Sequence, residues 1–334
     1  MKNKKTIFSS LSFSLLLLCI VPLMLFSLVS CDEEDVPKDT TIYYTATFDF
    51  KNGDEPYTVK VEDGALVVPP IAPDRENYIF NGWKCKGYFW NFSQDYVYED
   101  LNFVAQWVDA SSIFTTKKNA DDSVTVTAYN GFLSEIRIPE VISGFKVTAI
   151  GDGVFKNYRN GNTSVIVLPE SVTSVGASAF QYCDGIKIEV KGKLSHIGDE
   201  AFNGCLLLEN ITLAEDLKTI PYKAFAGCTA LKDVKIPKSV TTVAEDAFDG
   251  CAAFQTIIIA STDLTVENSA FANCDGLLTV FFEGSKEEWE EIVPKIDAGG
   301  GGNGDLLGAK VYFYSETEVE GDYWRYDNGE PRCW

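Results

Sequence analysis

The chain repeats itself with a period of about 23 residues, and this period constrains the fold more than any other feature. Six phenylalanines recur at intervals of 22 to 25 residues: Phe155, Phe180, Phe202, Phe225, Phe248 and Phe271. In the last five copies alanine precedes the phenylalanine and a cysteine follows it three residues later, at Cys183, Cys205, Cys228, Cys251 and Cys274. A period this short cannot hold two packed helices, and it fits one coil of a β-containing solenoid.

The solenoid interpretation assigns a role to each feature that recurs between the copies of the repeat. A β-branched run such as Val165–Leu168 lies upstream of each phenylalanine and is expected to pair with the same run in neighbouring coils. The phenylalanines and cysteines are expected to point inward and to stack. Gly176 and Gly198 are expected at a tight bend where a side chain would clash. Asp199–Phe202 and Glu245–Phe248 are predicted as single helical turns with acidic residues near their N-termini.

The repeats also resemble a known family. Ile236–Val240 reads Ile-Pro-Lys-Ser-Val and Ala247–Cys251 reads Ala-Phe-Asp-Gly-Cys, a combination that resembles the BspA-like leucine-rich repeat. The resemblance covers about residues 110–292. Three copies lack the Pro-x-Ser-Val element, at 191–194, 214–217 and 260–263. The resemblance implies a mainly-β α/β solenoid, a leucine-rich-repeat superhelix with short helical turns. It also implies binding to host matrix proteins or to the surface proteins of other bacteria.

A different β-rich pattern precedes the repeats. Residues 44–50 and 57–61 are predicted strands joined by the turn Asn52–Asp54, and a proline-rich crossing follows. A Gly-Trp pair ending at Trp83 and an Ala-Gln-Trp ending at Trp107 complete the pattern. This order of landmarks resembles the Listeria–Bacteroides repeat, also called the internalin B-repeat. The resemblance implies a small β-grasp-like domain that serves as a spacer or adhesive stalk.

The N-terminus has the features of a targeting segment. Met1–Lys5 carries three lysines, Ile7–Val29 is almost uncharged, and Leu28–Cys31 reads Leu-Val-Ser-Cys. This arrangement resembles the lipobox of bacterial lipoproteins, which implies cleavage after Ser30 and a lipid anchor on Cys31. The alternative is an ordinary transmembrane anchor with an incidental cysteine, because the apolar stretch is nearly long enough to span a bilayer.

The acidic run that follows Cys31 bears on localisation. Asp32–Asp35 resembles the charged export tag of surface-exposed lipoproteins in the Bacteroidetes. This resemblance implies that the protein is anchored by a lipid to the outer membrane and exposed at the cell surface. The alternatives are periplasmic retention and a plain solvated tether.

These patterns divide the chain into five parts. They are a lipoprotein signal peptide (1–30), an acidic tether (31–42), the β-grasp-like repeat (43–108), the solenoid (109–296) and a glycine loop with a C-terminal aromatic cap (297–334).

The C-terminal parts are expected to close the solenoid. An amphipathic helix is predicted at Glu287–Ile292, where it would cover the open end of the last coil. The glycine run Gly299–Gly304 is predicted as a loop, and Val311–Tyr314 as a further strand.

Charge narrows the classes of partner. The chain has 49 acidic and 28 basic residues, for a net charge of −21. A surface this negative repels phosphate backbones, so nucleic acid is excluded as a partner, and partners with basic patches are favoured.

The sequence offers little for catalysis. The single histidine, His196, has no evident carboxylate, serine or cysteine partner, and is expected to be an exposed strand residue. The repeat cysteines would form a straight row, which suits small buried side chains better than tetrahedral metal ligands. Disulfides between neighbouring coils stay open as an alternative, as does pairing of Cys85 and Cys333. We therefore expect no enzyme activity, no metal and no cofactor.

The leading hypothesis is a lipid-anchored cell-surface protein whose leucine-rich-repeat surface serves adhesion or protein binding. The alternative is a glycan-binding surface lipoprotein. Its sugar platform would be built from exposed aromatic side chains, with candidates Tyr88, Phe89, Trp90, Tyr323, Trp324 and Trp334.

Overall fold

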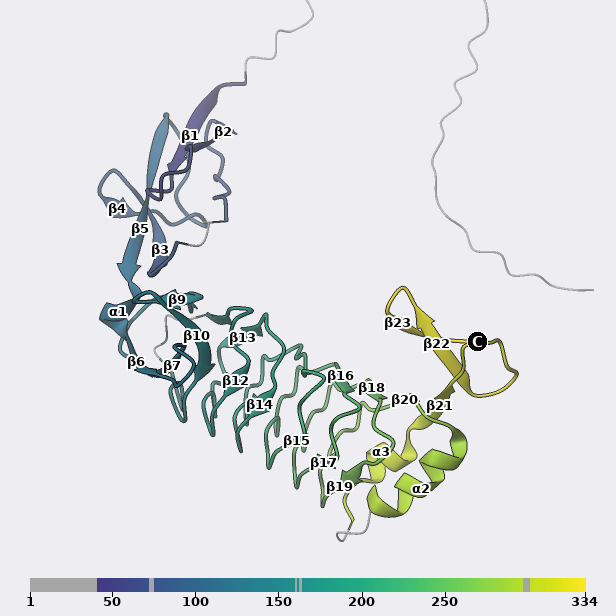
Figure 1. The fold of residues 1–334 in the computed structure, drawn as a ribbon. Coiled ribbons are helices and arrows are strands. Elements are labelled where there is room, and N and C mark those ends of the chain that lie inside the picture. The colour runs from purple at the N-terminus through teal and green to yellow at the C-terminus, as the bar shows by residue number, and fades with distance from the viewer. Residues whose placement is uncertain (1–40, 72–74, 160, 162–163, 297–300) are drawn as a thin grey trace, which may run out of the picture. The chain divides into compact units, whose positions relative to one another are not determined.

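The computed structural model describes residues 41–71, 75–159, 161, 164–296 and 301–334. Figure 1 shows the described residues, of which Tyr43–Trp334 belong to one unit. The predicted signal peptide, Cys31 and almost all of the acidic tether lie outside the described residues.

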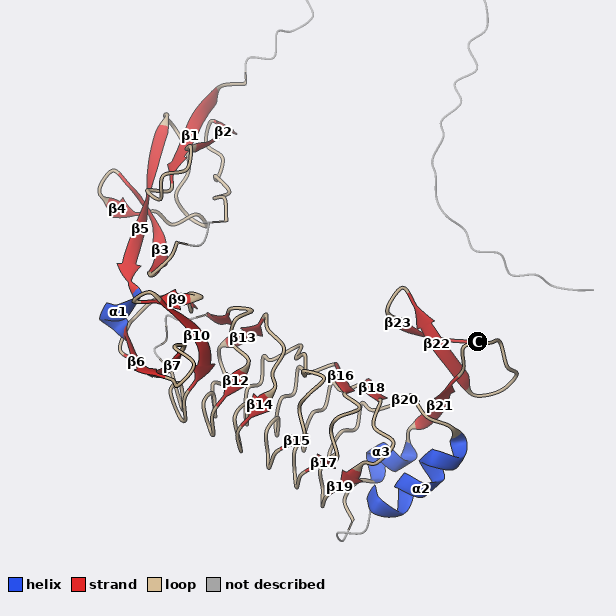
Figure 2. Cartoon of the chain, viewed as in Figure 1, coloured by secondary structure: helices blue, strands red, loops and turns tan. Residues whose placement is uncertain are grey.

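The first part of this unit is a five-stranded sheet (Figure 2). Its strands are β1 (Tyr43–Asp49), β2 (Tyr57–Glu62), β3 (Tyr78–Cys85), β4 (Tyr88–Phe89) and β5 (Leu101–Asp109). They lie in the order β2-β1-β5-β3-β4, and β1 and β5 pair in parallel. This order, with the first and last strands as parallel neighbours, is that of a β-grasp sheet, as the resemblance implied. We call residues 43–109 the module.

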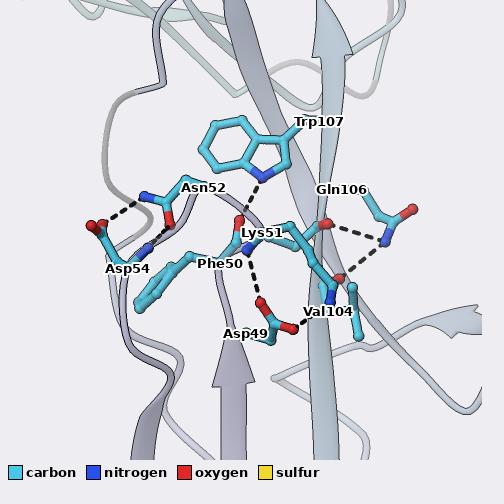
Figure 3. A network of polar contacts seen from close by, with 9 residues as sticks. Asp49, Phe50, Lys51, Asn52, Asp54, Val104, Gln106 and Trp107 are labelled. Atoms are coloured by element: carbon cyan, nitrogen blue, oxygen red, sulfur yellow. Dashed lines mark hydrogen bonds and ion pairs between the residues drawn. The ribbon is translucent and has the colours of Figure 1, made fainter.

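Aromatic side chains fill the core of the module. The Phe48 ring lies 4.6 Å from Phe103 and 4.9 Å from Trp83, measured between ring centroids. Trp107 donates a hydrogen bond of 2.7 Å from its indole nitrogen to the Phe50 carbonyl oxygen (Figure 3). This bond fixes the end of β1 against β5. Trp83 and Trp107 therefore belong to the framework, as their place in the motif predicted.

The predicted turn between the first two strands is also present. Asn52 and Asp54 are joined by two hydrogen bonds, from Asn52 Nδ2 to Asp54 Oδ2 (2.6 Å) and from the Asp54 amide to Asn52 Oδ1 (3.1 Å) (Figure 3). Gly53 between them has a φ of +99°, which glycine adopts without steric cost. The Asp49 carboxylate accepts the Lys51 amide, and hydrogen bonding to Lys51 lowers the pKa of Asp49.

A short helix and a hairpin begin the solenoid. Helix α1 (Ala110–Ile113) follows β5 directly, and the Asp109 side chain caps it by accepting the Ser111 amide. Strands β6 (Phe114–Lys118) and β7 (Val124–Tyr129) form an antiparallel hairpin, and β7 then pairs in parallel with β10 of the first coil. This hairpin covers the N-terminal end of the repeat stack. It was not predicted from the sequence.

The coils contribute two stacks of parallel strands (Figure 1). The longer strands are β8 (Glu135–Arg137), β11 (Val165–Leu168), β13 (Lys187–Val190), β16 (Asp233–Ile236), β18 (Thr256–Ile259) and β20 (Thr279–Phe282). The other stack begins with β10 (Phe145–Ile150), whose antiparallel hairpin partner is β9 (Val141–Ile142). It continues with shorter strands of two residues each: β12 (Ser174–Val175), β14 (His196–Ile197), β15 (Thr219–Ile220), β17 (Thr242–Val243) and β19 (Thr265–Val266). The predicted pairing of equivalent runs is confirmed, for example Ile166 with Ile188.

The repeated phenylalanines stack as predicted. The five centroid distances along the row from Phe155 to Phe271 lie between 5.1 and 5.5 Å, with ring planes within 15° of parallel. Every ring in the row is at most 1% exposed. Gly176 and Gly198 lie at the expected tight bend, because a Cβ on either would come within 2.8 Å of backbone atoms of the preceding coil.

One local prediction is wrong. Asp199–Phe202 and Glu245–Phe248 are not helical turns, since Glu200 and Asp246 have φ values of +57° and +56°. The amides that a helix would use internally bond instead to the next coil, as from Glu200 to the Tyr222 carbonyl (2.8 Å). Stacking between coils therefore replaces local helix formation.

The C-terminal end is closed by two helices and a sheet extension. Helix α2 (Lys286–Ile296) confirms the predicted amphipathic helix, with Trp289, Ile292 and Ile296 buried against the last coil. Helix α3 (Gly304–Gly308) begins where a glycine loop was predicted. Strands β21 (Lys310–Tyr314), β22 (Tyr323–Asp327) and β23 (Glu330–Cys333) continue the sheet of β16, β18 and β20.

Side chains of the closing segment replace the hydrogen bonds of a missing coil. In earlier coils the phenylalanine amide donates to the next coil's alanine carbonyl, as from Phe248 to Ala270 (2.8 Å). In the last coil the Phe271 amide donates to Asn303 Oδ1 instead (3.0 Å). The Cys274 amide donates to an Asp305 carboxylate oxygen (2.9 Å), whereas the cysteine amides of earlier coils donate to the phenylalanine carbonyl of their own coil. The end of the stack is thereby left without exposed, unpaired backbone donors at these two positions.

Candidate binding surface

The longer strands present a solvent-facing surface that we call the strand face. Because side chains alternate along a strand, the residues flanking Ile136, Ile166, Ile188, Val234 and Ile257 point away from the core. The outward residues that are at least partly exposed are Glu135, Arg137, Val165, Lys187, Glu189, Asp233, Lys235, Thr256 and Ile258. The inward positions are repeatedly aliphatic, whereas the outward positions change type from coil to coil.

The first half of the strand face is charged. Ion pairs connect neighbouring side chains: Glu135–Arg137, Lys187–Glu189 (3.2 Å), Lys187–Glu209 (3.9 Å) and Lys232–Glu209 (3.7 Å). The side chains of these pairs are between 37% and 57% exposed, so each pair adds little to stability. Exposed charges of both signs on a rigid sheet are instead suited to recognition of a complementary charged surface.

The second half carries both charged and apolar outward residues, among them Lys235, Ile258 and Phe281, and the hairpin β22–β23 lies over it. Tyr326 of β22 receives a hydrogen bond of 3.1 Å from Lys235 of β16. In the sheet β22 lies four strands from β16, roughly 19 Å at a spacing of about 4.8 Å per strand. The hairpin must therefore fold back over the strand face. Trp324 of the hairpin lies 5.1 Å from the Phe281 ring and is fully buried.

A polar cluster holds the hairpin in place. Lys235 forms an ion pair of 2.9 Å with Glu283, and the Tyr326 hydroxyl donates to the same carboxylate. Burial lowers the pKa of Lys235, but hydrogen bonds to Glu283 and Tyr326 outweigh burial and raise it overall. Burial, followed by the hydrogen bond to Glu283, raises the pKa of Tyr326 to about 12. The hairpin does not cover the first half of the strand face, from β8 to β13, although β8 contacts β3 of the module and Val167 of β11 is buried.

The repeat cysteines are structural. Each thiol is buried and donates to the phenylalanine carbonyl of the preceding coil, with distances of 3.0 to 3.2 Å. Burial raises the pKa of Cys183 and Cys274 to about 12, and that of the three cysteines between them well above its usual value. The described cysteines, Cys85 and Cys333 among them, are all free thiols. A protonated, buried thiol is neither a nucleophile nor a metal ligand.

His196 is an exposed residue of β14, as predicted, and its strand neighbour is Ser174. Over the part of the chain that the structure describes, no group of three or more His, Cys, Asp or Glu side chains is placed to hold a metal ion.

The aromatic candidates for a sugar platform differ in their exposure to solvent. Trp324 is fully buried and Trp90 is 9% exposed, so neither ring offers a free face. Tyr88 and Phe89 are each about half exposed, at 49% and 51%, but they are successive residues of β4 and point to opposite faces. Within the C-terminal tail Trp324 is a packing residue. Tyr323 and Trp334 are partly exposed neighbours, because the Trp334 amide donates to the Tyr323 carbonyl (3.2 Å).

The predicted lipidation site, Cys31, lies outside the described residues. Within the described part of the chain, no helix has the length and apolar character needed to cross a membrane.

The residues that close half of the strand face were not predicted. Lys235 looks like an ordinary outward lysine in the repeat, and Tyr326 belongs to a tail that was assigned only to capping. The one available signal was the density of aromatic residues after residue 311, which is more than a solvated tail requires.

Comparison with known families identifies both kinds of repeat. Residues 148–278 match the model of the BspA type leucine rich repeat region in six copies. Residues 44–106 match the Listeria-Bacteroides repeat domain. The chain thus contains a BspA-type leucine-rich-repeat region preceded by a Listeria–Bacteroides repeat, which confirms both resemblances drawn from its motifs.

Individual relatives match parts of the chain. A leucine rich cell surface protein of Faecalibacterium prausnitzii is 28% identical, with 51% of this chain and 52% of that chain covered and a TM-score of 0.40. A leucine-rich-repeat protein of T. pallidum is 25% identical, with 52% and 84% covered and a TM-score of 0.45. A protein of Evansella cellulosilytica described as a Gly-rich membrane protein is 26% identical over 102 residues, which are 29% of this chain and 12% of that protein.

Proposed function

We propose that the chain is a lipid-anchored cell-surface protein that binds other proteins through the open half of its strand face. The observation that carries the proposal is the contrast between the two sides of the repeat. Inward positions keep the same type of residue in successive coils, while outward positions such as Glu135, Val165 and Lys187 differ. A rigid scaffold with a variable, charged outer surface is the arrangement expected of a recognition surface.

The anchor is part of the same proposal. The lipobox-like segment ending at Cys31 and the acidic residues after it support attachment to the outer membrane with display at the cell surface. Matches to a leucine rich cell surface protein and to a membrane protein support an association with the cell envelope. The candidate partners are host matrix proteins and surface proteins of other bacteria.

Biolayer interferometry tests the binding half of the proposal. Residues 32–334 would be immobilised and exposed to extracellular-matrix proteins and to a polysaccharide panel. The double variant Lys187→Ala/Glu189→Ala removes two exposed charges from the open strand face, and we expect it to weaken a saturable protein interaction about tenfold. The matched control is Lys218→Ala/Glu245→Ala, which removes one charge of each sign beside the shorter strands and should bind like wild type.

The same experiment distinguishes protein binding from the alternative, glycan binding. Tyr88, half exposed and stacked on Trp90 at 6.1 Å, is the observation that favours this alternative. Binding to polysaccharides alone, lost in Tyr88→Ala and kept in the Lys187→Ala/Glu189→Ala variant, would replace the protein-binding proposal with glycan capture.

A further inference from the structure

The module has one long open sheet edge, formed by β2. On one side β2 pairs with β1 over six residue pairs, from Tyr43 with Glu62 to Phe48 with Tyr57. On its other side, within the described residues, no strand pairs with it. Apart from the Glu62 carbonyl, which accepts the Ala65 amide (3.0 Å), the backbone donors and acceptors that point to that side of β2 can bind a further strand.

Three of the other sheet edges among the described residues, β4, β6 and β23, carry features that discourage pairing. Strand β4 is only two residues long, and β6 carries Lys117 and Lys118 side by side. Strand β23 carries Pro331, which has no amide hydrogen, next to Arg332. Short length, adjacent lysines and proline are the usual means by which edges avoid pairing with other chains. Strand β2 has no proline and a single lysine, Lys60.

An apolar groove runs beside this edge. It encloses about 360 Å³, and its apolar lining comes from β2 and the segment after it: Tyr57, Val59, Val61, Ala65, Leu66, Val68, Pro69 and Pro70. Val68 is 82% exposed, and Tyr57 and Leu66 are 46% and 40% exposed. A strand added to β2 would place every second side chain in this groove, because Tyr57, Val59 and Val61 alternate toward the same side.

The charged residues at the two ends of the groove indicate which kind of segment could bind there. Asp54 and Glu55 precede β2, Glu62 and Asp63 end it, and all four are exposed. Lys60 is the one basic residue of β2. An extended segment with basic residues at both ends and alternating apolar residues between them is complementary to this charge pattern.

We propose that β2 of the module captures an extended segment of a partner protein by strand addition. The segment's backbone pairs with the free edge of β2, its alternating apolar side chains enter the groove beside Val59 and Val68, and its basic ends contact the acidic residues at the ends of the groove. This site lies entirely within the module, so it stands independently of the function proposed for the strand face.

Fluorescence anisotropy with the whole chain from residue 32 tests the proposal. The probe is a fluorescein-labelled peptide in which valine and threonine alternate over the length of β2, with lysines at both ends. We expect saturable binding, and about a tenfold loss of affinity in Val68→Asp, which places a charge in the groove. Because Val68 is 82% exposed, this variant should fold normally. The control is Leu278→Asp, at a position of the solenoid that is 68% exposed.

A second peptide identifies strand addition as the binding mode. It has the same sequence, but alternate backbone amides are methylated so that one of its edges cannot donate hydrogen bonds. Strand addition predicts that this peptide does not bind. Equal binding of both peptides, full binding by Val68→Asp, or no binding of the first peptide would each overturn the proposal. So would sedimentation of the wild-type chain as a dimer that Val68→Asp dissociates, since a second copy would then occupy the edge.

Discussion

At the scale of single residues, the repeat cysteine meets two requirements at once. It is small enough for a fully buried row in which neighbouring coils lie close together, and its thiol can donate a weak hydrogen bond. The Phe180 carbonyl, for example, accepts both the Cys183 amide (3.1 Å) and the Cys205 thiol (3.1 Å). Alanine would lack the donor, and a larger side chain would separate the coils.

This account predicts how the thiols react. In native residues 32–334 at pH 8, we expect Ellman's reagent to modify Cys333 quickly and to leave the repeat cysteines intact. Cys333 is exposed, whereas Cys183 and Cys274 are buried. Burial raises the pKa of both thiols to about 12, so almost none of either is present as thiolate at pH 8. Unfolding in guanidinium should release the remaining thiols together. Rapid native-state modification of a repeat cysteine, located by peptide mass spectrometry, would contradict the proposed burial.

At the scale of elements, the ends of the solenoid determine whether the stack is stable. Each coil supplies backbone partners to the next, so the last coil needs substitutes. The side chain of Asn303 supplies substitute hydrogen bonds. Its Oδ1 accepts the Phe271 amide, and its Nδ2 donates to the carbonyls of Glu267 (2.9 Å) and Ile296 (2.8 Å). The same residue therefore joins the last coil to the end of α2.

Replacing this side chain should loosen the C-terminal end locally. We expect Asn303→Ala to reduce the free energy of unfolding by about 1–3 kcal/mol, the usual effect of leaving buried backbone groups without partners. Hydrogen exchange followed by mass spectrometry should show faster exchange in the last coil and α2, and unchanged exchange near Phe180. The control is Asn210→Ala, at an exposed asparagine of the solenoid. Uniform acceleration along the whole solenoid would indicate that Asn303 does not act as a local cap.

Elements were predictable from sequence where the physical cause was local or periodic. The buried rows of phenylalanine and cysteine were predicted from the spacing of these residues in the sequence. The first two strands of the module were predicted from the alternation of side-chain types on either side of Asn52–Asp54. The fold-back of β22 over the strand face was not predictable, since Lys235 and Tyr326 are 91 residues apart and belong to no shared motif. The helical turn expected at Asp199–Phe202 failed because bonds to the next coil outweigh local helix propensity.

At the scale of the whole molecule, the strand face is divided between two uses. Its second half is occupied by the chain's own hairpin through Trp324 and Tyr326, and its first half, which this hairpin does not cover, carries the exposed charges of Lys187 and Glu189. The chain's net charge of −21 adds long-range attraction for partners with basic surfaces. A surface-anchored molecule with this organisation would offer one polar recognition surface on the solenoid and one backbone-pairing edge, β2, on the module.

Adhesion of intact cells to immobilised extracellular-matrix proteins tests this account most directly. Three strains are compared, producing the wild-type chain, Cys31→Ala, and Lys187→Ala/Glu189→Ala, with surface display of each chain measured by antibody labelling of whole cells. We predict that the wild type adheres, that Cys31→Ala loses both display and adhesion, and that the strand-face variant keeps display but loses most adhesion. Full adhesion by the strand-face variant, or by cells that display no chain, would contradict the account.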